Sequence, residues 1–354
     1  MVLKGGLVNK GFPVRVIYIV LSFLFLQPVN AVACEYPRGP VFKLLEEWTK
    51  SCGHPLCGKI HIAEPSRLKE SAKGCDAPGW ISMREDIRTT IVAGGAVLFG
   101  EVHDNALHHE LRSRLGMSNF ASVVMEQMPN DKSAILDTFW RETAKNYKDG
   151  DIDKLKTAVD WANGGWSKYN YDPLFLAILK GAQPIFAGDA PRETIKTIAK
   201  GGEAAVSAED KTRLALDKPL GEKLDAAALS EIELAHCNAL PKEALGGMAY
   251  AQRYRDATLS DGVITAISKR GSTLLIAGNG HVRKDRGVAW YLGQRKPGLK
   301  TLSIQLIEVE EGKTDAAAYV PLDPDGKPAA DYVIFTPKAE RADPCEAMKA
   351  KKPE

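Results

Sequence analysis

Acidic and imidazole side chains follow directly after an apolar stretch at Val97–Asn105, which reads VLFGEVHDN. Glu101, His103 and Asp104 are residue types that bind transition metals or transfer protons in acid–base catalysis. One cluster is weak evidence, because Glu101 alone can cap a helix and a lone His103 is more often a hydrogen-bonding residue of the fold. Its meaning depends on whether other apolar stretches end in the same way.

Three further apolar stretches also end in polar residues. These residues are Glu126, Asp189, Asn279, His281 and Arg283. A carboxylate such as Glu126 beside a buried strand needs a partner. Asp189 is also typical of a helix cap, and the glycines around His281 are also typical of a structural turn. Ligands of a parallel α/β sheet bind outside the carboxyl ends of its strands, so we expect all four strand ends to share one crevice.

Short β-branched or apolar stretches alternate with longer segments that have a period of 3.6 residues, and this alternation predicts an α/β fold. We expect a mainly parallel sheet flanked by helices, with a helical insert and a loop-rich, cysteine-containing N-terminal extension. The expected strands are residues 96–99, 122–126, 184–188, 273–278, 301–309 and 332–335. The expected helices are residues 41–48, 105–115, 131–147, 173–180, 191–200, 224–237 and 247–267, with 201–221 as a surface connection.

The N-terminus has the pattern of a secretory signal peptide. Three basic residues precede the apolar stretch Val16–Leu26, and the small residues Ala31–Ala33 precede Cys34. We therefore expect a signal peptide at 1–33, the extension at 34–83, the main domain at 84–337 and a polar tail at 338–354. An uncleaved membrane anchor and a lipidated Cys34 are the alternatives. The chain would then be exported, to the bacterial periplasm or to a lipid anchor at a membrane.

Six cysteines and a net charge of +2 limit the classes of function. An exported chain favours disulfides, whose pairing stays open among fifteen arrangements. Bridges within the cluster Cys52, Cys57 and Cys75 would staple the extension. A metal knuckle through His54 is less favoured, because no second matching pair follows it. The charge does not indicate nucleic acid, and no Gly-rich phosphate loop or Gly-x-Ser-x-Gly motif is present.

A stretch rich in aromatic residues, DWANGGWSKYNYDPLF at residues 160–175, is the second functional feature. Core packing at a loop crossing would explain it, but so would a wall for a flat apolar ligand, with a tyrosine oxygen available to iron. In AQRYRDATL, Arg255 and Asp256 belong to one helix; they would form a helix salt bridge, orient a ligand or hold a propionate. On the helix after the first strand, we expect His109 to face the crevice and His108 to face solvent.

Five motifs together resemble the ChaN-like haem-binding uptake proteins, an iron-regulated lipoprotein family in the superfamily of Tiki metalloproteases and erythromycin esterases. They are LFGEVHDNALHHEL, VVMEQM, YDPLFLAILKGAQPIFAGDAPRE, AQRYRDATLSDGV and LLIAGNGHVRKDRGVAWYL, in this order between residues 87 and 292. The resemblance implies an α/β fold, an exported bacterial protein and haem at the strand ends. In the haem-binding member of known structure, haems lie face to face across a dimer with tyrosine ligands, which implies a homodimer here.

Two functions follow as hypotheses. The first is haem binding in iron uptake, with Tyr171 as the preferred ligand and Tyr169 as the second choice; the other expected haem contacts are Trp166, Arg255, His281 and Arg283. The second is a metal-dependent hydrolase of esterase or protease type, in which four residues bind a divalent transition metal or activate water. These four are Glu101, His103, Glu126 and His281. A non-catalytic scaffold with a relict site is a third possibility.

Overall fold

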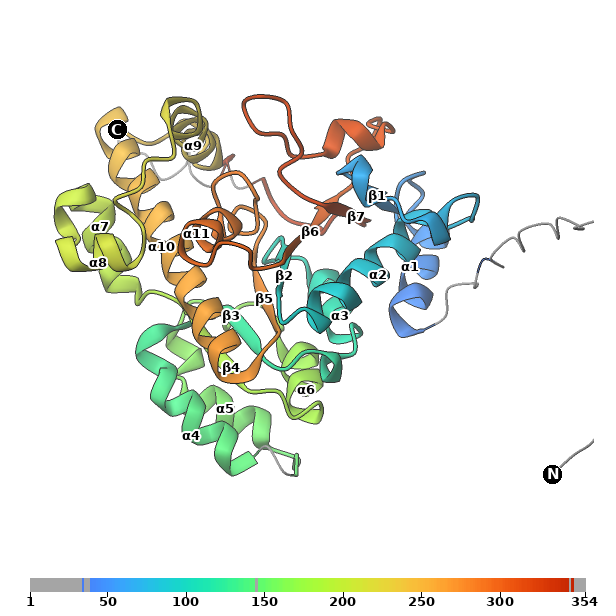
Figure 1. The fold of residues 1–354 in the computed structure, drawn as a ribbon, viewed down its shortest axis with the longest axis horizontal. Helices are drawn as coiled ribbons and strands as arrows, with labels where there is room; N and C mark the ends of the chain where they lie inside the picture. The colour runs from blue at the N-terminus through green and yellow to red at the C-terminus, as the bar shows by residue number, and fades with distance from the viewer. Residues whose placement is uncertain (1–33, 35–38, 144–145, 344, 347–354) are drawn as a thin grey trace, which may run out of the picture. The chain divides into compact units, whose positions relative to one another are not determined.

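A seven-stranded sheet in the order β1-β7-β6-β2-β5-β3-β4 carries the site residues (Figure 1). The computed structural model describes residues 34, 39–143, 146–343 and 345–346, so the expected signal peptide lies outside the described residues. The strands are β1 (Ile60–Ile62), β2 (Ala96–Glu101), β3 (Val123–Pro129), β4 (Ile185–Asp189), β5 (Thr273–Gly278), β6 (Thr301–Glu308) and β7 (Tyr332–Thr336). Only β1 pairs antiparallel, with β7, which confirms the mainly parallel sheet.

The helices of the described residues are more numerous than the sequence periodicity predicts. They are α1 (Pro40–Ser51), α2 (Pro78–Val92), α3 (Ala106–Ser113), α4 (Ser133–Thr143), α5 (Asp151–Ala158), α6 (Asp172–Lys180), α7 (Arg192–Gly201), α8 (Ala208–Arg213), α9 (Glu222–Ala235), α10 (Lys242–Arg270) and α11 (Val288–Arg295). Helices α2, α5, α8 and α11 were not predicted from the sequence. The expected surface connection at residues 201–221 contains α8, and its residues Val206, Leu214 and Leu216 are buried in a cluster with α7 and α10.

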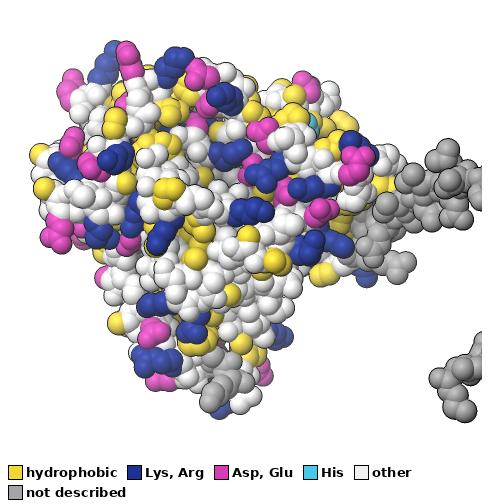
Figure 2. Space-filling view, in the orientation of Figure 1, with side chains coloured by type: hydrophobic (Ala, Val, Ile, Leu, Met, Phe, Trp, Pro, Cys, Tyr) yellow, Lys and Arg dark blue, Asp and Glu magenta, His cyan; other side chains and the backbone are white. Residues whose placement is uncertain are grey.

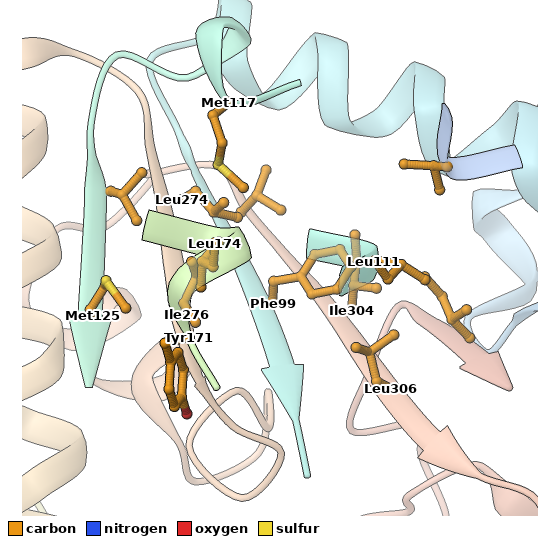
Figure 3. Packing of buried hydrophobic residues seen from close by; sticks show 14 of the residues in the cluster. Phe99, Leu111, Met117, Met125, Tyr171, Leu174, Leu274, Ile276, Ile304 and Leu306 are labelled. Carbon is orange, nitrogen blue, oxygen red and sulfur yellow. The ribbon is translucent and has the colours of Figure 1, made fainter. Parts of the chain in front are cut away.

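Successive strand residues face opposite sides of the sheet, and each side is covered by helices. Leu98, on one face, belongs to a cluster with Leu259 of α10 and Leu292 of α11. The neighbouring Phe99, on the other face, packs in a cluster with Leu111 of α3 and Leu174 of α6 (Figure 3). Because both faces of the sheet are buried, its strands are apolar at successive positions and do not alternate between apolar and polar residues.

The segment expected as a loop-rich extension contains ordered structure from Gly39 onward. Helix α1 buries Val41, Leu44 and Trp48 in the same core cluster that contains Phe99. Strand β1 adds to the edge of the sheet beside β7. Three residues are too few for β1 to show a sequence period, which explains why the sequence does not predict it.

One disulfide joins two cysteines that are close in the sequence, and another joins two that are far apart in it. Cys52 pairs with Cys57, and Cys237 after α9 pairs with Cys345 near the C-terminus. Cys34 and Cys75 are also disulfide-bonded. The first pair confirms the expectation that disulfides staple the extension, whereas no sequence pattern distinguishes the second pair.

Charged side chains of both signs are interspersed on the face drawn in Figure 2. This mixture agrees with the small net charge of +2 and leaves no large patch of one sign on that face. Among the described residues, no helix combines the length and the apolar composition needed to cross a membrane.

Candidate functional site

Four parallel strands bring their carboxyl ends to one edge of the sheet in the order β2-β5-β3-β4. The register pairs Glu101 at the end of β2 with Gly278 at the end of β5. Glu126 and Asp189 come from β3 and β4 on the other side of β5. The neighbouring strands therefore place three buried carboxylates along one edge.

Glu101 is enclosed in a network of buried hydrogen bonds. Its Oε1 accepts from Tyr171 Oη at 2.5 Å and from Gln127 Nε2 at 3.1 Å. Its Oε2 forms an ion pair with the guanidinium of Arg112, a residue with no solvent exposure. Burial lowers the pKa of Arg112 to about 10, against the attraction of neighbouring oxygens. The ion pair keeps Glu101 as a carboxylate inside the core.

His103 stands between the two glutamates. Its Nδ1 lies 2.7 Å from Glu101 Oε1, and because a carboxylate only accepts, Nδ1 carries the proton. Its Nε2 lies 3.6 Å from Glu126 Oε1, and its ring meets Trp166 edge to face at 4.8 Å. Burial lowers the pKa of His103, although Glu126 acts in the opposite direction. His103 is thus a neutral imidazole with a basic Nε2 and a side chain 29% exposed.

Glu126 is surrounded by cationic groups and donors. Its Oε1 accepts from Arg255 Nη2 at 2.6 Å, and its Oε2 accepts from the backbone nitrogen of Gly278 at 2.7 Å. His281 Nε2 lies 3.5 Å from Oε1. Burial opposes the charge of Glu126, but the positive charges of His281 and Arg255 outweigh burial and hold its pKa well below the ordinary value.

His281 and Asp256 form a buried pair behind Glu126. His281 Nδ1 lies 2.7 Å from Asp256 Oδ1, and the side-chain amide of Gln252 lies 3.1 Å from the same nitrogen. Burial disfavours the imidazolium, yet Glu126 and Asp256 raise the pKa of His281 to about 10. Burial raises the pKa of Asp256 to about 6, although His281 opposes this shift. The carboxylate therefore fixes the orientation of His281 and favours its protonated form.

A cavity of about 730 Å³ opens above this edge. Its floor contains His103, Glu126 and Arg255, and its walls include Trp161, Trp166, Tyr169 and Gly165 of the aromatic stretch. Lys132, Lys168 and Arg192 also line it. The cavity lining thus combines aromatic, cationic and acidic side chains, a combination typical of ligand sites.

The structure brings together Glu101, His103, Glu126 and His281, the four residues that the sequence analysis singled out at the strand ends. Their surroundings differ, because only His103 and Glu126 line the cavity. Glu101 and His281 lie behind them, and each is almost fully buried.

The expected haem contacts divide into two groups. Trp166, Tyr169 and Arg255 line the cavity, as a haem contact requires. Tyr171 packs among the buried residues (Figure 3), donates to Glu101 and does not line the cavity, and the choice of haem ligand stays a prediction. His281 is buried, and Arg283 binds Asp285 and the carbonyl of Leu322 outside the cavity.

The helix salt bridge, one of three alternatives left open for Arg255 and Asp256, does not form, and both expectations about the histidines of α3 are wrong. His109 is buried against the carbonyl of His103 and does not line the cavity. Arg255 and Asp256 do not pair with each other: Arg255 bridges Glu126 and Asp189, while Asp256 binds His281. His108 is buried rather than solvent-facing, since its Nδ1 accepts from the backbone of Val102. The partners of Arg255 and Asp256 lie on distant strands or loops, and His108 Nε2 lies 2.8 Å from Thr336 Oγ1 of β7. Helix periodicity cannot reveal such partners.

Two residues of the site, Gln127 and Arg112, were not predicted from the sequence. Gln127 adjoins Glu126, and its side chain donates to Glu101 and Tyr171. Arg112 follows His108 by one helical turn and is fully buried. A basic residue on the apolar face of a helix is the signal that would have revealed Arg112, because a buried cation requires a buried anion.

No group of three or more His, Cys, Asp and Glu side chains within the described residues is arranged to hold a metal ion. Arg255 donates a hydrogen bond to Glu126. Glu101 forms an ion pair with Arg112 and accepts a hydrogen bond from Tyr171. The carboxylates expected as ligands are therefore turned toward cations and donors of the chain itself. What the geometry offers directly is acid–base chemistry through His103 Nε2 and recognition of a flat, anionic ligand.

Residues 89–292 match the family described as "Haem-binding uptake, Tiki superfamily, ChaN". Among solved structures, the chain is similar to ChaN of Campylobacter jejuni, described for cofacial heme binding, with 20% identity and a TM-score of 0.49 over 70% of this chain and 90% of that chain. It is also similar to a mutant of the erythromycin esterase EreC, with 10% identity and a TM-score of 0.39 over 81% and 99% of the two chains. A search of the curated proteins finds no match.

Proposed function

This chain belongs to the family of haem-binding uptake proteins of the Tiki superfamily, and from that premise we propose that it binds haem as the cargo of bacterial iron uptake, in the cavity above the strand ends. The observation that carries the location is the cavity itself. Its volume of about 730 Å³ lies within the range of small-molecule sites, roughly 300–1,000 Å³. Its lining contains aromatic side chains for the macrocycle and cationic side chains for the propionates.

The cavity residues fit haem in two respects. Trp161, Trp166 and Tyr169 offer aromatic surface to the flat apolar macrocycle. Lys132 and Arg192 offer positive charge to the two propionates, and Arg pairs with carboxylates through two parallel hydrogen bonds. Haem would bring the iron chemistry, while the chain binds and orients the macrocycle and excludes water.

Tyr169 is the tyrosine that we assign to the iron. It lines the cavity beside Trp166, whereas Tyr171 is committed to Glu101 in the core. His103 supplies a second candidate nitrogen, because its neutral ring leaves Nε2 without a proton. Glu101 behind His103 is the kind of carboxylate that orients a ligating imidazole.

The test is a titration of the purified mature protein with hemin. We expect a saturable shift of the Soret band at micromolar protein, with the spectrum altered and the affinity reduced in Tyr169→Phe. Tyr147→Phe is the matched control, because this tyrosine lies away from the cavity lining. A wild-type protein that gives no saturable shift would overturn haem binding, and an unchanged Tyr169→Phe would overturn the ligand assignment.

The proposed location is outside the cytoplasm. The signal-peptide pattern at residues 1–33 and the disulfides of the described residues support export. A thioether-linked lipid would require the Cys34 sulfur, which is disulfide-bonded here, so cleavage without lipidation is favoured over a membrane tether. The homodimer implied by the family is tested by measuring the mass in solution with and without hemin.

A hydrolase is the second candidate, favoured by His103 and the His281–Asp256 pair at one strand edge. His103 Nε2 would act as a general base, and Arg255 would stabilise negative charge. A metal-dependent form would require Arg255 to leave Glu126. Ester and peptide substrates test this candidate, and turnover that is lost in His103→Ala but retained in Tyr169→Phe would support it. Stoichiometric metal that is lost in His281→Ala would support the metal-dependent form.

A further inference from the structure

A second cavity, of about 200 Å³, lies between α9 and α10. Its apolar lining consists of Leu220, Ala228, Ile232, Ala235 and Ala249. Its polar lining includes Asp256, the residue that orients His281. His281 connects the two cavities, since its Nδ1 meets Asp256 in the second and its Nε2 faces Glu126 in the first.

Asp256 presents an acceptor to the second cavity. The side chain is 6% exposed, and Oδ1 is bound by His281 at 2.7 Å. Among the described residues, no donor bonds to Oδ2. Because Oδ2 is not among the buried atoms that lack a partner, it is accessible, and a ligand that brings a hydroxyl or amide group can donate to it in place of solvent.

Helix α9 leaves room for such a ligand to enter. None of its residues is fully buried, and Leu229 and Leu234 are 37% and 66% exposed. A helix gains most of its stability from the apolar face that it buries, and α9 buries little apolar surface. An aliphatic group between α9 and α10 would be removed from water and would add contacts to both helices.

The charges around the cavity select the head group of the ligand. Asp256 already has its counter-charge in His281, and the lining also contains the charged residues Arg253, Arg286 and Glu231. Arg286 is itself paired with Glu231 and Asp285. A second cation beside Asp256 would be repelled, and an anion would meet the carboxylate directly.

We propose that the cavity between α9 and α10 binds a small uncharged amphiphile with a short aliphatic body, whose hydroxyl or amide head donates to Asp256 Oδ2. Such a ligand shares Asp256 with His281. Its binding therefore changes the hydrogen bonding of the imidazole that faces Glu126, and this links the second cavity to the first. The inference goes beyond haem binding and stands on a different cavity.

Gly280 gives a direct way to fill the cavity. A Cβ at Gly280 would have no atom closer than 3.9 Å, with Glu231 Oε1 and Gln252 Nε2 as its nearest neighbours. Gly280 lies outside the positive φ range, so a side chain there meets no backbone strain. Gly246 on α10 is exposed, and a Cβ added there would have no atom within 4 Å, which makes Gly246→Leu the matched control.

The experiment measures the melting temperature during titration with 1-hexanol, hexanoate and hexylammonium. We expect a saturable rise with 1-hexanol alone. The rise should be lost in Gly280→Leu and retained in Gly246→Leu. If Gly280→Leu fails to fold, Ala228→Leu fills the same cavity from α9. The absence of a saturable rise, or an equal rise in the filled variant, would overturn the site.

The link between the cavities has its own readout. Hemin affinity measured with and without saturating 1-hexanol should change by the same factor as the 1-hexanol affinity measured with and without hemin. An unchanged hemin affinity would overturn the link. If hemin does not bind at all, haem binding fails as the function, while the melting curves still test the second cavity.

Discussion

Glu101 ends β2, and Glu126 follows Met125, the last β3 residue that pairs with β5; the two strands lie on either side of β5, and both glutamates are buried and paired with arginine. Their arginines differ. Arg112 has no exposure and holds Glu101 inside the core, whereas Arg255 is 20% exposed and lines the cavity. Glu101 is thus a structural carboxylate of the core. Glu126 lies in the cavity lining, beside a partner, Arg255, that also lines the cavity.

The comparison teaches that access, rather than residue type, separates support from function at this edge. The Glu101 side fixes the tautomer of His103 from behind, through Tyr171, Gln127 and Arg112. On the Glu126 side, Arg255 lines the cavity, so an anionic ligand would compete with Glu126 for the guanidinium. Substitutions on the two sides should therefore affect stability and binding to different degrees.

The largest expected effect is that of Arg112→Met. It leaves Glu101 charged and buried without its cation, which costs about 3–5 kcal/mol of unfolding free energy in urea denaturation. Arg255→Met also removes the cation of Asp189, but it should cost less, because Glu126 keeps the Gly278 donor and His281, and burial already raises the pKa of Asp189 so that this carboxyl can take up a proton.

The control for this prediction adds Glu101→Gln to Arg112→Met, which removes the unpaired charge and should recover much of the loss. Equal losses in the two arginine variants would end the distinction between the two sides.

At low pH, the free energy of unfolding should fall because of His108, a buried residue of α3. Burial lowers its pKa to about 3 from 6.5, so the unfolded chain binds the proton first and stability falls as pH drops from about 6.5 toward 3. At pH 5 the loss is about 2 kcal/mol. Urea denaturation at pH 7 and pH 5 should show a smaller difference in His108→Asn than in wild type. The same difference in both would mean that other groups dominate acid unfolding.

The two tyrosines provide a finer test. Tyr171→Phe removes a 2.5 Å hydrogen bond to a carboxylate and should lower the unfolding free energy by about 1.5 kcal/mol. Tyr169→Phe should leave stability almost unchanged, because its hydroxyl has no hydrogen bond among the described residues. Chemical denaturation of both variants, beside their hemin titrations, measures the two effects. A stability loss in Tyr169→Phe would place this residue on the structural side.

The smallest expected effect is at the outer surface of the His103 loop. Arg341 pairs with Asp104 and Glu308 and is 25% exposed. Arg341→Ala should cost about 0.2–1 kcal/mol, and less in high salt, because water screens an exposed ion pair. A loss as large as that of Arg112→Met would mean that the loop is supported from outside rather than from the core.

The sequence predicts the strands of the site well because they are short, apolar and bounded by glycine or polar residues. The expected strand at residues 273–278 coincides with β5, and the other site strands differ at their ends by a few residues. The convergence of Glu101, His103, Glu126 and His281 followed from one rule, that parallel strands end at the same edge. The two short helices α5 and α8 and the three-residue strand β1 left no clear period to detect.

The sequence by itself determined the sheet and the edge at which its polar residues gather, since both follow from the period and direction of the strands. Only the tertiary structure decided that Tyr171 is buried and Tyr169 faces the cavity, although they lie two residues apart in one stretch. It also assigned Arg112 to Glu101 and Arg255 to Glu126. Access and partners depend on which distant segments pack together, and no local spacing carries that information.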